Sequence, residues 1–343
     1  MTARVIAFWL ACLLLTLQCI AGERSYWVWH RSDPLTASEV TELGQQHVST
    51  LYWHSGTLAP RGDHWHWRER PRALAEVAPG LRIVPVVRIE SEDHDPFANL
   101  AALRAQLALV ARAGAVQLDY DCPDRLLPNY AVALGVLRAD FPQLSITALA
   151  HWPRLKDFHV LARNVSEMCP MFYDLQADPR GISATNPPPP LLDSVQIGTT
   201  LSDWSACPVR WRAGLPAFTR LTRFDSHGIS RGQIPDWQWA DVVFHTHLRA
   251  IAPTRMGVTL LRADTDTRVA GRSLYEGDIL AVRMPDRTAL AKSLAAAERS
   301  GAAGVVLFRL PGRADSAAQS LAALNDLAAT PKPTLQRESH TSI

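Results

Sequence analysis

Short apolar runs alternate with amphipathic stretches along most of the chain. The runs predict buried strands at residues 26–30, 49–54, 82–90, 115–121, 144–150, 168–175, 209–218 and 304–309. Apolar residues three or four positions apart predict helices at 38–46, 73–77, 96–114, 126–140, 155–165, 191–202, 288–300 and 314–328. Such alternation is typical of a parallel sheet covered by helices, and about eight repeats favour a closed (β/α)8 TIM-like barrel.

The region before the last strand departs from this alternation. Residues 257–263 and 279–284 predict a β-hairpin insertion, unless one of the two runs is itself a barrel strand. Residues 64–67, His-Trp-His-Trp, are expected in a loop, and Gly114 is expected to cap the preceding helix. No Gly-x-Gly-x-x-Gly motif follows a strand, which argues against an open dinucleotide-binding fold.

The two ends of the chain predict processing and disorder. Arg4, an apolar core at 5–17 and small residues up to Ala21 are typical of a signal peptide over residues 1–21. We therefore expect an exported protein, periplasmic or secreted, with an uncleaved N-terminal anchor as the alternative. Residues 22–328 would form a single barrel domain without a membrane span, and residues 329–343 a disordered tail.

The composition excludes several classes of function. A net charge of +2 gives no reason to expect nucleic acid as a partner. Two His-x-His pairs, at 64–66 and 245–247, lack an evident third ligand, so we predict neither a metal nor another cofactor. The three cysteines beyond the leader, Cys122, Cys169 and Cys207, allow one disulfide of undetermined pairing in an oxidising compartment. The oligomeric state remains open.

Two carboxylates end the fourth predicted strand. Asp119 and Asp121 are two residues apart, so their side chains point to the same side of the strand. The C-terminal ends of barrel strands are where active sites are built, and adjacent acids raise each other's pKa. We predict a catalytic pair here. In the alternative interpretation, Asp121 caps the helix that follows and Asp119 forms an ion pair.

The other strand ends would bring further polar and aromatic side chains to the same rim. These are Trp29, His30, His54, Arg88, Glu90, His151, Trp152, Tyr173, Asp174 and Arg309. Aromatic rings match the flat faces of sugars, carboxylates and Arg match their hydroxyl groups, and glycoside cleavage commonly uses two carboxyl groups. We predict Glu90 as a further catalytic acid and His151 with Trp152 as a stacking platform. Alternatively, Arg88 and Glu90 form an ion pair inside the barrel, and Arg309 only holds a loop.

Two short motifs resemble the family-18 chitinase-like barrels. Residues 118–121, Leu-Asp-Tyr-Asp, resemble part of that family's Asp-x-x-Asp-x-Asp-x-Glu strand, and residues 171–174, Met-Phe-Tyr-Asp, resemble its Met-x-Tyr-Asp strand. The resemblance implies that Tyr173 and Asp174 hold substrate. Val116 occupies the family's first Asp position and Pro123 its catalytic Glu position. The family's chemistry therefore does not carry over intact, and Asp124 or Glu90 is a candidate substitute.

A resemblance to a second family covers most of the chain beyond the leader. Residues 117–121, 145–150 and 305–311 are similar to a bacterial family known as domain of unknown function 3142, a glycosidase-like TIM barrel. This resemblance implies a barrel fold and export, and it brings no established reaction. We predict a glycoside-hydrolase-like protein with carbohydrate as its partner, in which Arg88, His151, Trp152, Arg309 and Trp29 contribute to substrate binding. The alternative is a catalytically inactive carbohydrate-binding or scaffold barrel.

Overall fold

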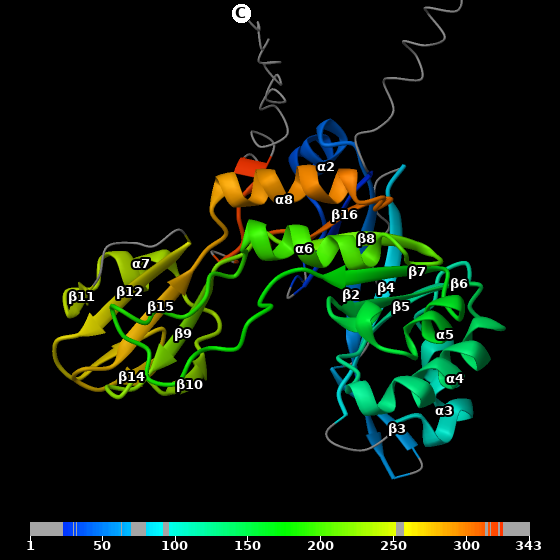
Figure 1. Ribbon diagram of the computed structural model, residues 1–343, viewed down its shortest axis with the longest axis horizontal. Helices are drawn as coiled ribbons and strands as arrows, with labels where there is room; N and C mark the ends of the chain where they lie inside the picture. Colours follow the sequence, from blue (N-terminus) through cyan, green and yellow to red (C-terminus); the bar gives the residue numbers. More distant parts are fainter. Residues whose placement is uncertain are drawn as a thin grey trace, which may run out of the picture.

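The computed structural model describes residues 23–29, 31, 33–62, 64–69, 80–91, 96–251, 257–312, 315, 317–321, 323 and 324. Among these residues, eight parallel strands close into a barrel (Figure 1). In their order around the ring, they are β1 (Glu23–Val28), β2 (Val48–Arg61), β4 (Arg82–Ile89), β5 (Ala115–Asp119), β6 (Gln143–Leu149), β7 (Glu167–Met171), β8 (Arg210–Pro216) and β16 (Gly304–Phe308). The predicted (β/α)8 barrel and all eight of its predicted strands are confirmed.

Helices connect the strands and cover the outside of the ring. They are α2 (Ala37–Gln45), α3 (Leu100–Ala108), α4 (Leu127–Arg138), α5 (Phe158–Arg163), α6 (Ser194–Trp204) and α8 (Arg287–Arg299), with short 3-10 turns η1 (Pro96–Asn99), η2 (Asp124–Leu126) and η3 (Trp152–Arg154). Several begin at a capping side chain: Thr36 and Glu39 form a capping box at α2, and Asp193 and Asp286 cap α6 and α8.

The helix predicted over residues 96–114 is shorter in the structure. It opens as η1, continues as α3 and ends at Ala108, well before Gly114. Ala113 and Gly114 both have positive φ, so the chain turns into β5 there instead of extending the helix. A Cβ at Gly114 would lie 3.0 Å from Cδ of Pro142, which adds a steric reason for glycine.

The predicted loop at residues 64–67 is wrong, because this segment is a strand. β2 runs beyond the barrel, and β3 (His64–Glu69) pairs with that extension in antiparallel orientation. Trp65 and Trp67 lie two positions apart and face the same side. Their indole nitrogens donate to the Asn99 carbonyl (3.2 Å) and to Gln106 (2.7 Å), which anchors the hairpin against η1 and α3.

A second sheet is inserted between β8 and α8, at the left of Figure 1. Its five antiparallel strands are, in sheet order, β10 (Ser230–Gln233), β9 (Arg220–Phe224), β15 (Ile279–Arg283), β12 (Val258–Ala263) and β11 (Leu248–Ala250). The insertion also holds α7 (Trp239–Val243) and the hairpin of β13 (Thr267–Val269) and β14 (Arg272–Leu274). The predicted pairing of the two apolar runs is confirmed as β12 with β15, but the insertion is larger than a hairpin.

Apolar side chains fill two layers around the barrel strands. Tyr26 and Val28 of β1 face the helices, whereas Trp27 and Trp29 face the barrel interior. This alternation follows from the two-residue period of a strand. The interior also contains polar groups: the Trp27 indole donates to Gln117 at 2.7 Å, and the amide of Gln117 contacts the Cys169 sulfur at 3.4 Å.

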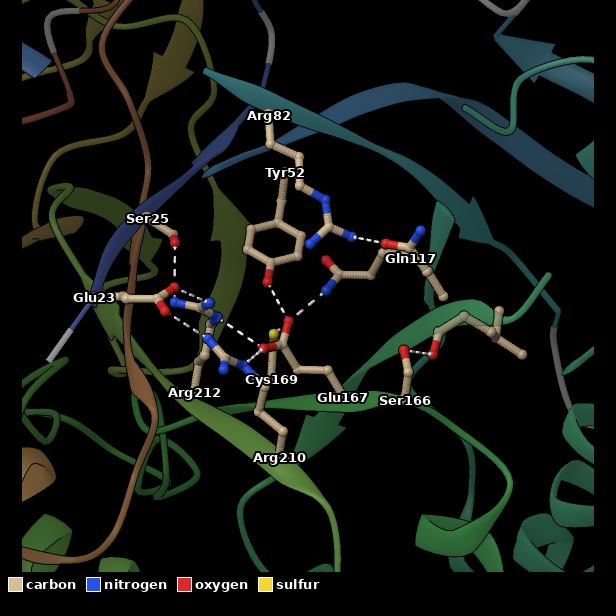
Figure 2. A network of polar contacts seen from close by, with 12 residues as sticks. Glu23, Ser25, Tyr52, Arg82, Gln117, Ser166, Glu167, Cys169, Arg210 and Arg212 are labelled. Carbon is tan, nitrogen blue, oxygen red and sulfur yellow. Dashed lines mark hydrogen bonds and ion pairs between the residues drawn. The ribbon is translucent and has the colours of Figure 1, made fainter. Parts of the chain in front are cut away.

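A charged network closes the N-terminal end of the barrel, opposite the strand ends predicted to carry the site (Figure 2). Glu167 accepts hydrogen bonds from Arg210 and Arg212, both at 2.8 Å, and from the hydroxyl of Tyr52. The two arginines also reach Glu23. Arg212 and Glu167 are largely buried and are tolerated because each has charged partners, whereas Arg210 and Glu23 are about half exposed at the edge of the network.

Several predictions fall outside the described residues. They are the signal peptide, the tail at 329–343, the helix at 73–77 and seven of the fifteen residues of the helix at 314–328. The described part of that last segment is helical only at residues 321, 323 and 324. The predicted start of the helix at 314 is wrong, because residues 317–320 are not helical and Ala318 forms a bridge with Phe218. Within the part of the chain that the structure describes, no helix has both the length and the apolar character needed to cross a membrane. Among the described residues, no disulfide joins Cys122, Cys169 and Cys207, although three thiols would allow one; Cys122 and Cys169 are buried.

Candidate active site

A pocket with a volume of about 650 Å³ opens at the C-terminal ends of the barrel strands. Its aromatic lining comprises Trp27, Trp29, Tyr173, Phe218 and Phe308, and its charged lining comprises Arg88, Asp119, Asp121, His151, Arg154, Asp174, Arg220 and Arg309. The strand ends therefore converge on one pocket, but the predicted rim residues His54, Glu90 and Trp152 do not line it. His30 lies outside the described residues.

Asp119 is the last residue of β5 and lies at the base of the pocket. Its carboxylate accepts a hydrogen bond of 2.8 Å from Thr147 on the neighbouring strand β6. Burial, together with the negative charge of Asp121, raises the pKa of Asp119 to about 6, although Thr147 and Arg88 act in the opposite direction. Asp119 thus changes its protonation state close to the physiological pH range.

Asp121 follows β5 and presents its side chain to the open pocket. Desolvation raises its pKa, and the positive charge of Arg88 partly offsets that effect. Asp121 does not cap a helix, because the N-cap residues of η2 and α4 are Pro123 and Leu126, and neither helix has a side-chain capping hydrogen bond. The capping interpretation of Asp121 is therefore wrong, and its carboxylate faces the solvent and any bound ligand.

Glu90 lies beside the main pocket. Its carboxylate is 2.9 Å from Arg68 and 3.7 Å from Arg88, so two guanidinium groups engage it. It lines a second cavity of about 580 Å³, to which Arg88, Asp119 and Asp121 also contribute. The Arg88–Glu90 ion pair is present, but on the exposed rim and not inside the barrel as the alternative interpretation required.

Stacked rings form the aromatic wall of the main pocket. Tyr173 lies nearly parallel to Phe308 with their ring centroids 6.0 Å apart, and Phe218 packs against both rings edge to face. Trp29 stacks on His54 at 4.2 Å. Burial raises the pKa of Tyr173, and the charges of Asp119 and Asp121 raise it further, so its hydroxyl stays protonated and able to donate.

Two predicted binding residues are engaged by partners. Asp174 pairs with Arg220 of β9, so this contact joins the barrel to the inserted sheet. Arg309 forms a bidentate pair with Asp315 at 2.5 and 2.7 Å, and Asp315 in turn accepts backbone N–H groups at residues 317 and 318. Arg309 therefore holds this loop and also lines the pocket, so its predicted part in substrate binding stays a prediction.

The stacking platform predicted at residues 151 and 152 is only half present. Trp152 is fully buried, because η3 turns its indole into the core under α6, and its proposed role in stacking on a sugar is wrong. His151 is exposed and lines the pocket, with Nε2 2.8 Å from Oδ1 of Asp124.

The inserted sheet contributes residues that the sequence did not indicate. Arg220 and Gln233 line the pocket from β9 and β10, and their position depends on how the insertion packs against the barrel. Phe218 lies two residues after the end of β8, and the strand-end rule applied to that strand would have found it. Arg154 and Gln196, from η3 and α6, carry no such signal.

The histidines of the second pair, His245 and His247, have partners other than a metal. His247 lies 3.2 Å from Asp264, and His245 lies 3.1 Å from the carbonyl oxygen of residue 268. Among the residues that the structure describes, no group of three or more His, Cys, Asp or Glu side chains has the arrangement of a metal site.

Comparison with solved structures relates the fold to carbohydrate-active barrels. The C-terminal domain of a putative chitinase from Desulfitobacterium hafniense DCB-2 is similar over 90% of this chain and 98% of its own, with 13% identity and a TM-score of 0.57. The spore cortex-lytic enzyme SleL of Bacillus megaterium QM B1551 is similar over 91% of this chain and 74% of its own, with 10% identity and a TM-score of 0.55.

A family-18 chitinase from Cycas revoluta, in complex with (GlcNAc)4, is similar over 90% of this chain and 98% of its own, with 15% identity and a TM-score of 0.51. No family model and no curated protein matches the sequence. The chain therefore has the barrel fold of family-18 chitinase-like proteins, and its resemblance to domain of unknown function 3142 stays a prediction.

Proposed function

We propose that the protein is an exported glycoside-hydrolase-like enzyme acting on an envelope or extracellular polysaccharide. The observation that carries the proposal is the meeting of Asp119 and Asp121 with the ring of Tyr173 in one open pocket. The volume is in the range of small-molecule sites, and the acids face an aromatic wall suited to a sugar ring. Export and membership of domain of unknown function 3142 are parts of this proposal that rest on the sequence.

Asp121 is the carboxylate that acts on the substrate. It is open to the pocket, and in its charged form it accepts a proton from a water molecule that attacks the anomeric carbon. Asp119 lies beneath it, and its own ionisation adjusts the charge at Asp121. The hydroxyl of Tyr173 is available to hold a sugar oxygen, and Arg88 balances the negative charge.

A catalytically inactive carbohydrate-binding barrel is the second candidate. Pro123 favours it, because the similar family has a glutamic acid at this position and proline has no proton to donate. The aromatic wall and the polar rim would serve sugar binding equally well without turnover.

A hydrolysis and binding screen separates the two. Chitotetraose, cellotetraose and peptidoglycan glycan strands are offered to the wild type, to Asp121→Asn and to Asp140→Asn, an exposed aspartate paired with Arg104 outside the pocket. For the enzyme, we expect new reducing ends from one glycan and a loss in kcat of about 10²- to 10⁴-fold in Asp121→Asn only. Binding without turnover by the wild type would establish the inactive barrel, and no binding at all would refute both.

A further inference from the structure

The proposed reaction lacks an assigned proton donor. Pro123 stands where the similar family has its acid, and it has extended backbone angles (φ −59°, ψ 139°) that start the turn η2. The turn moves the next residue, Asp124, toward the end of β6, where its carboxylate meets His151. The chain thus replaces one acidic side chain with a histidine–carboxylate pair beside the same pocket.

The pair is built by two neighbouring strands. β5 and β6 are hydrogen-bonded to each other, and the Thr147–Asp119 contact links their C-terminal ends. Asp124 follows β5 and His151 follows β6. Of the two side chains, only His151 lines the pocket, so the carboxylate holds the imidazole from outside. Asp124 occupies Nε2, which leaves Nδ1 for a ligand.

The backbone around His151 is fixed on both sides. The carbonyl of Ala150 accepts a hydrogen bond of 2.8 Å from the indole of Trp204, and the carbonyl of His151 accepts one of 3.1 Å from the amide of Arg154. The buried Trp152 anchors the next position in the core. A side chain held this way loses little freedom on binding a substrate, which is what a proton-transfer group needs.

We infer that His151 is the proton donor of this site and that Asp124 is the residue that positions it. The inference rests on the proposed function. The imidazolium of His151 gives the proton on Nδ1 to the glycosidic oxygen, and the bond from that oxygen to the anomeric carbon breaks with its electron pair on the departing hydroxyl group. Water attacks the anomeric carbon, and Asp121 takes the proton that this water loses. Solvent then returns both groups to their starting states.

The charged residues that line the pocket together with His151 are Arg88, Asp119, Asp121, Arg154, Asp174, Arg220 and Arg309. Asp124 contacts the imidazole from η2, and Asp121 shares the pocket with it. Arg154, on the same turn as the histidine, is engaged by Asp203 of α6 at 2.9 Å. Asp124 is therefore the carboxylate that holds the imidazole of His151 in place.

The test uses the glycan that the wild type cleaves in the screen above, together with the 2,4-dinitrophenyl glycoside of the same sugar. The variants are His151→Ala, Asp124→Asn and the matched control His159→Ala, an exposed histidine on α5 outside the pocket. For His151→Ala we expect kcat on the glycan to fall about 10²- to 10⁴-fold with little change in KM.

In the same variant, kcat for the dinitrophenyl glycoside should fall less than about tenfold, because its leaving group departs without needing a proton. Added imidazole should restore part of the glycan activity. Asp124→Asn should lower kcat about tenfold with little change in KM, because the imidazole is present but less well positioned. If His151→Ala keeps full glycan activity while Asp121→Asn loses it, this inference is wrong and the proposed function stands. A wild type that cleaves none of the glycans overturns both.

Discussion

Replacing Asp119 with asparagine is expected to stabilise the folded protein at neutral pH. The carboxylate is held in a desolvated position beside Asp121, and its pKa rises from an ordinary value of 3.8 to about 6. A group whose pKa is higher in the folded state binds its proton more tightly there. The folded state therefore loses stability as the pH rises from about 4 to about 6, and above that range the penalty is constant.

The magnitude follows from the two pKa values. At 1.36 kcal/mol per pH unit, the difference between 3.8 and about 6 corresponds to about 3 kcal/mol. The pocket is open to solvent, which screens the charge, so we expect a gain of about 1 to 3 kcal/mol. Asparagine has almost the same shape, and its carbonyl oxygen can still accept the 2.8 Å hydrogen bond from Thr147.

Urea unfolding followed by tryptophan fluorescence between pH 4 and pH 8 measures this effect. The stability difference between Asp119→Asn and the wild type should be near zero at pH 4 and should reach its full value by about pH 7. Asp140→Asn, which alters an exposed aspartate, should stay within about 0.5 kcal/mol throughout. If Asp119→Asn is less stable than the wild type, or if the stability difference does not grow with pH, then burial and Asp121 do not raise the pKa of Asp119.

Three further predictions concern packing and binding. Gly214→Ala should destabilise the barrel by about 1–3 kcal/mol in urea unfolding, because its new Cβ would lie 2.7 Å from the Trp27 ring. Trp152→Ala should cost about 3–5 kcal/mol by the same assay, as for a core residue; a stable protein with weakened glycan affinity would instead restore the platform role. Tyr173→Phe keeps the ring that stacks on Phe308, so calorimetry should give weaker glycan binding, by about tenfold, with unchanged unfolding; unaltered affinity would exclude a hydroxyl contact.

The alternation of apolar runs and amphipathic stretches determined the barrel. A parallel strand needs helices on its outer face, and this need leaves a local signature at every repeat. In a barrel, the C-terminal ends of the strands share one rim, because the direction of each strand follows from the fold class alone. This rule was enough to predict that Asp119, Asp121, Tyr173 and Trp29 lie close together, as they do in the pocket. The pairing of β12 with β15 was also visible as two apolar runs.

Tertiary structure alone decided which of the rim residues remain open to a ligand. Trp152 follows a strand end as His151 does, yet one turn of η3 buries its ring and exposes the imidazole. Arg220 reaches the pocket from an inserted sheet, and Asp315 takes up Arg309. The periodicity of the sequence specifies the face of a strand or helix from which a side chain projects. The partner of that side chain depends on contacts between segments far apart in the chain, and such contacts leave no local sequence pattern.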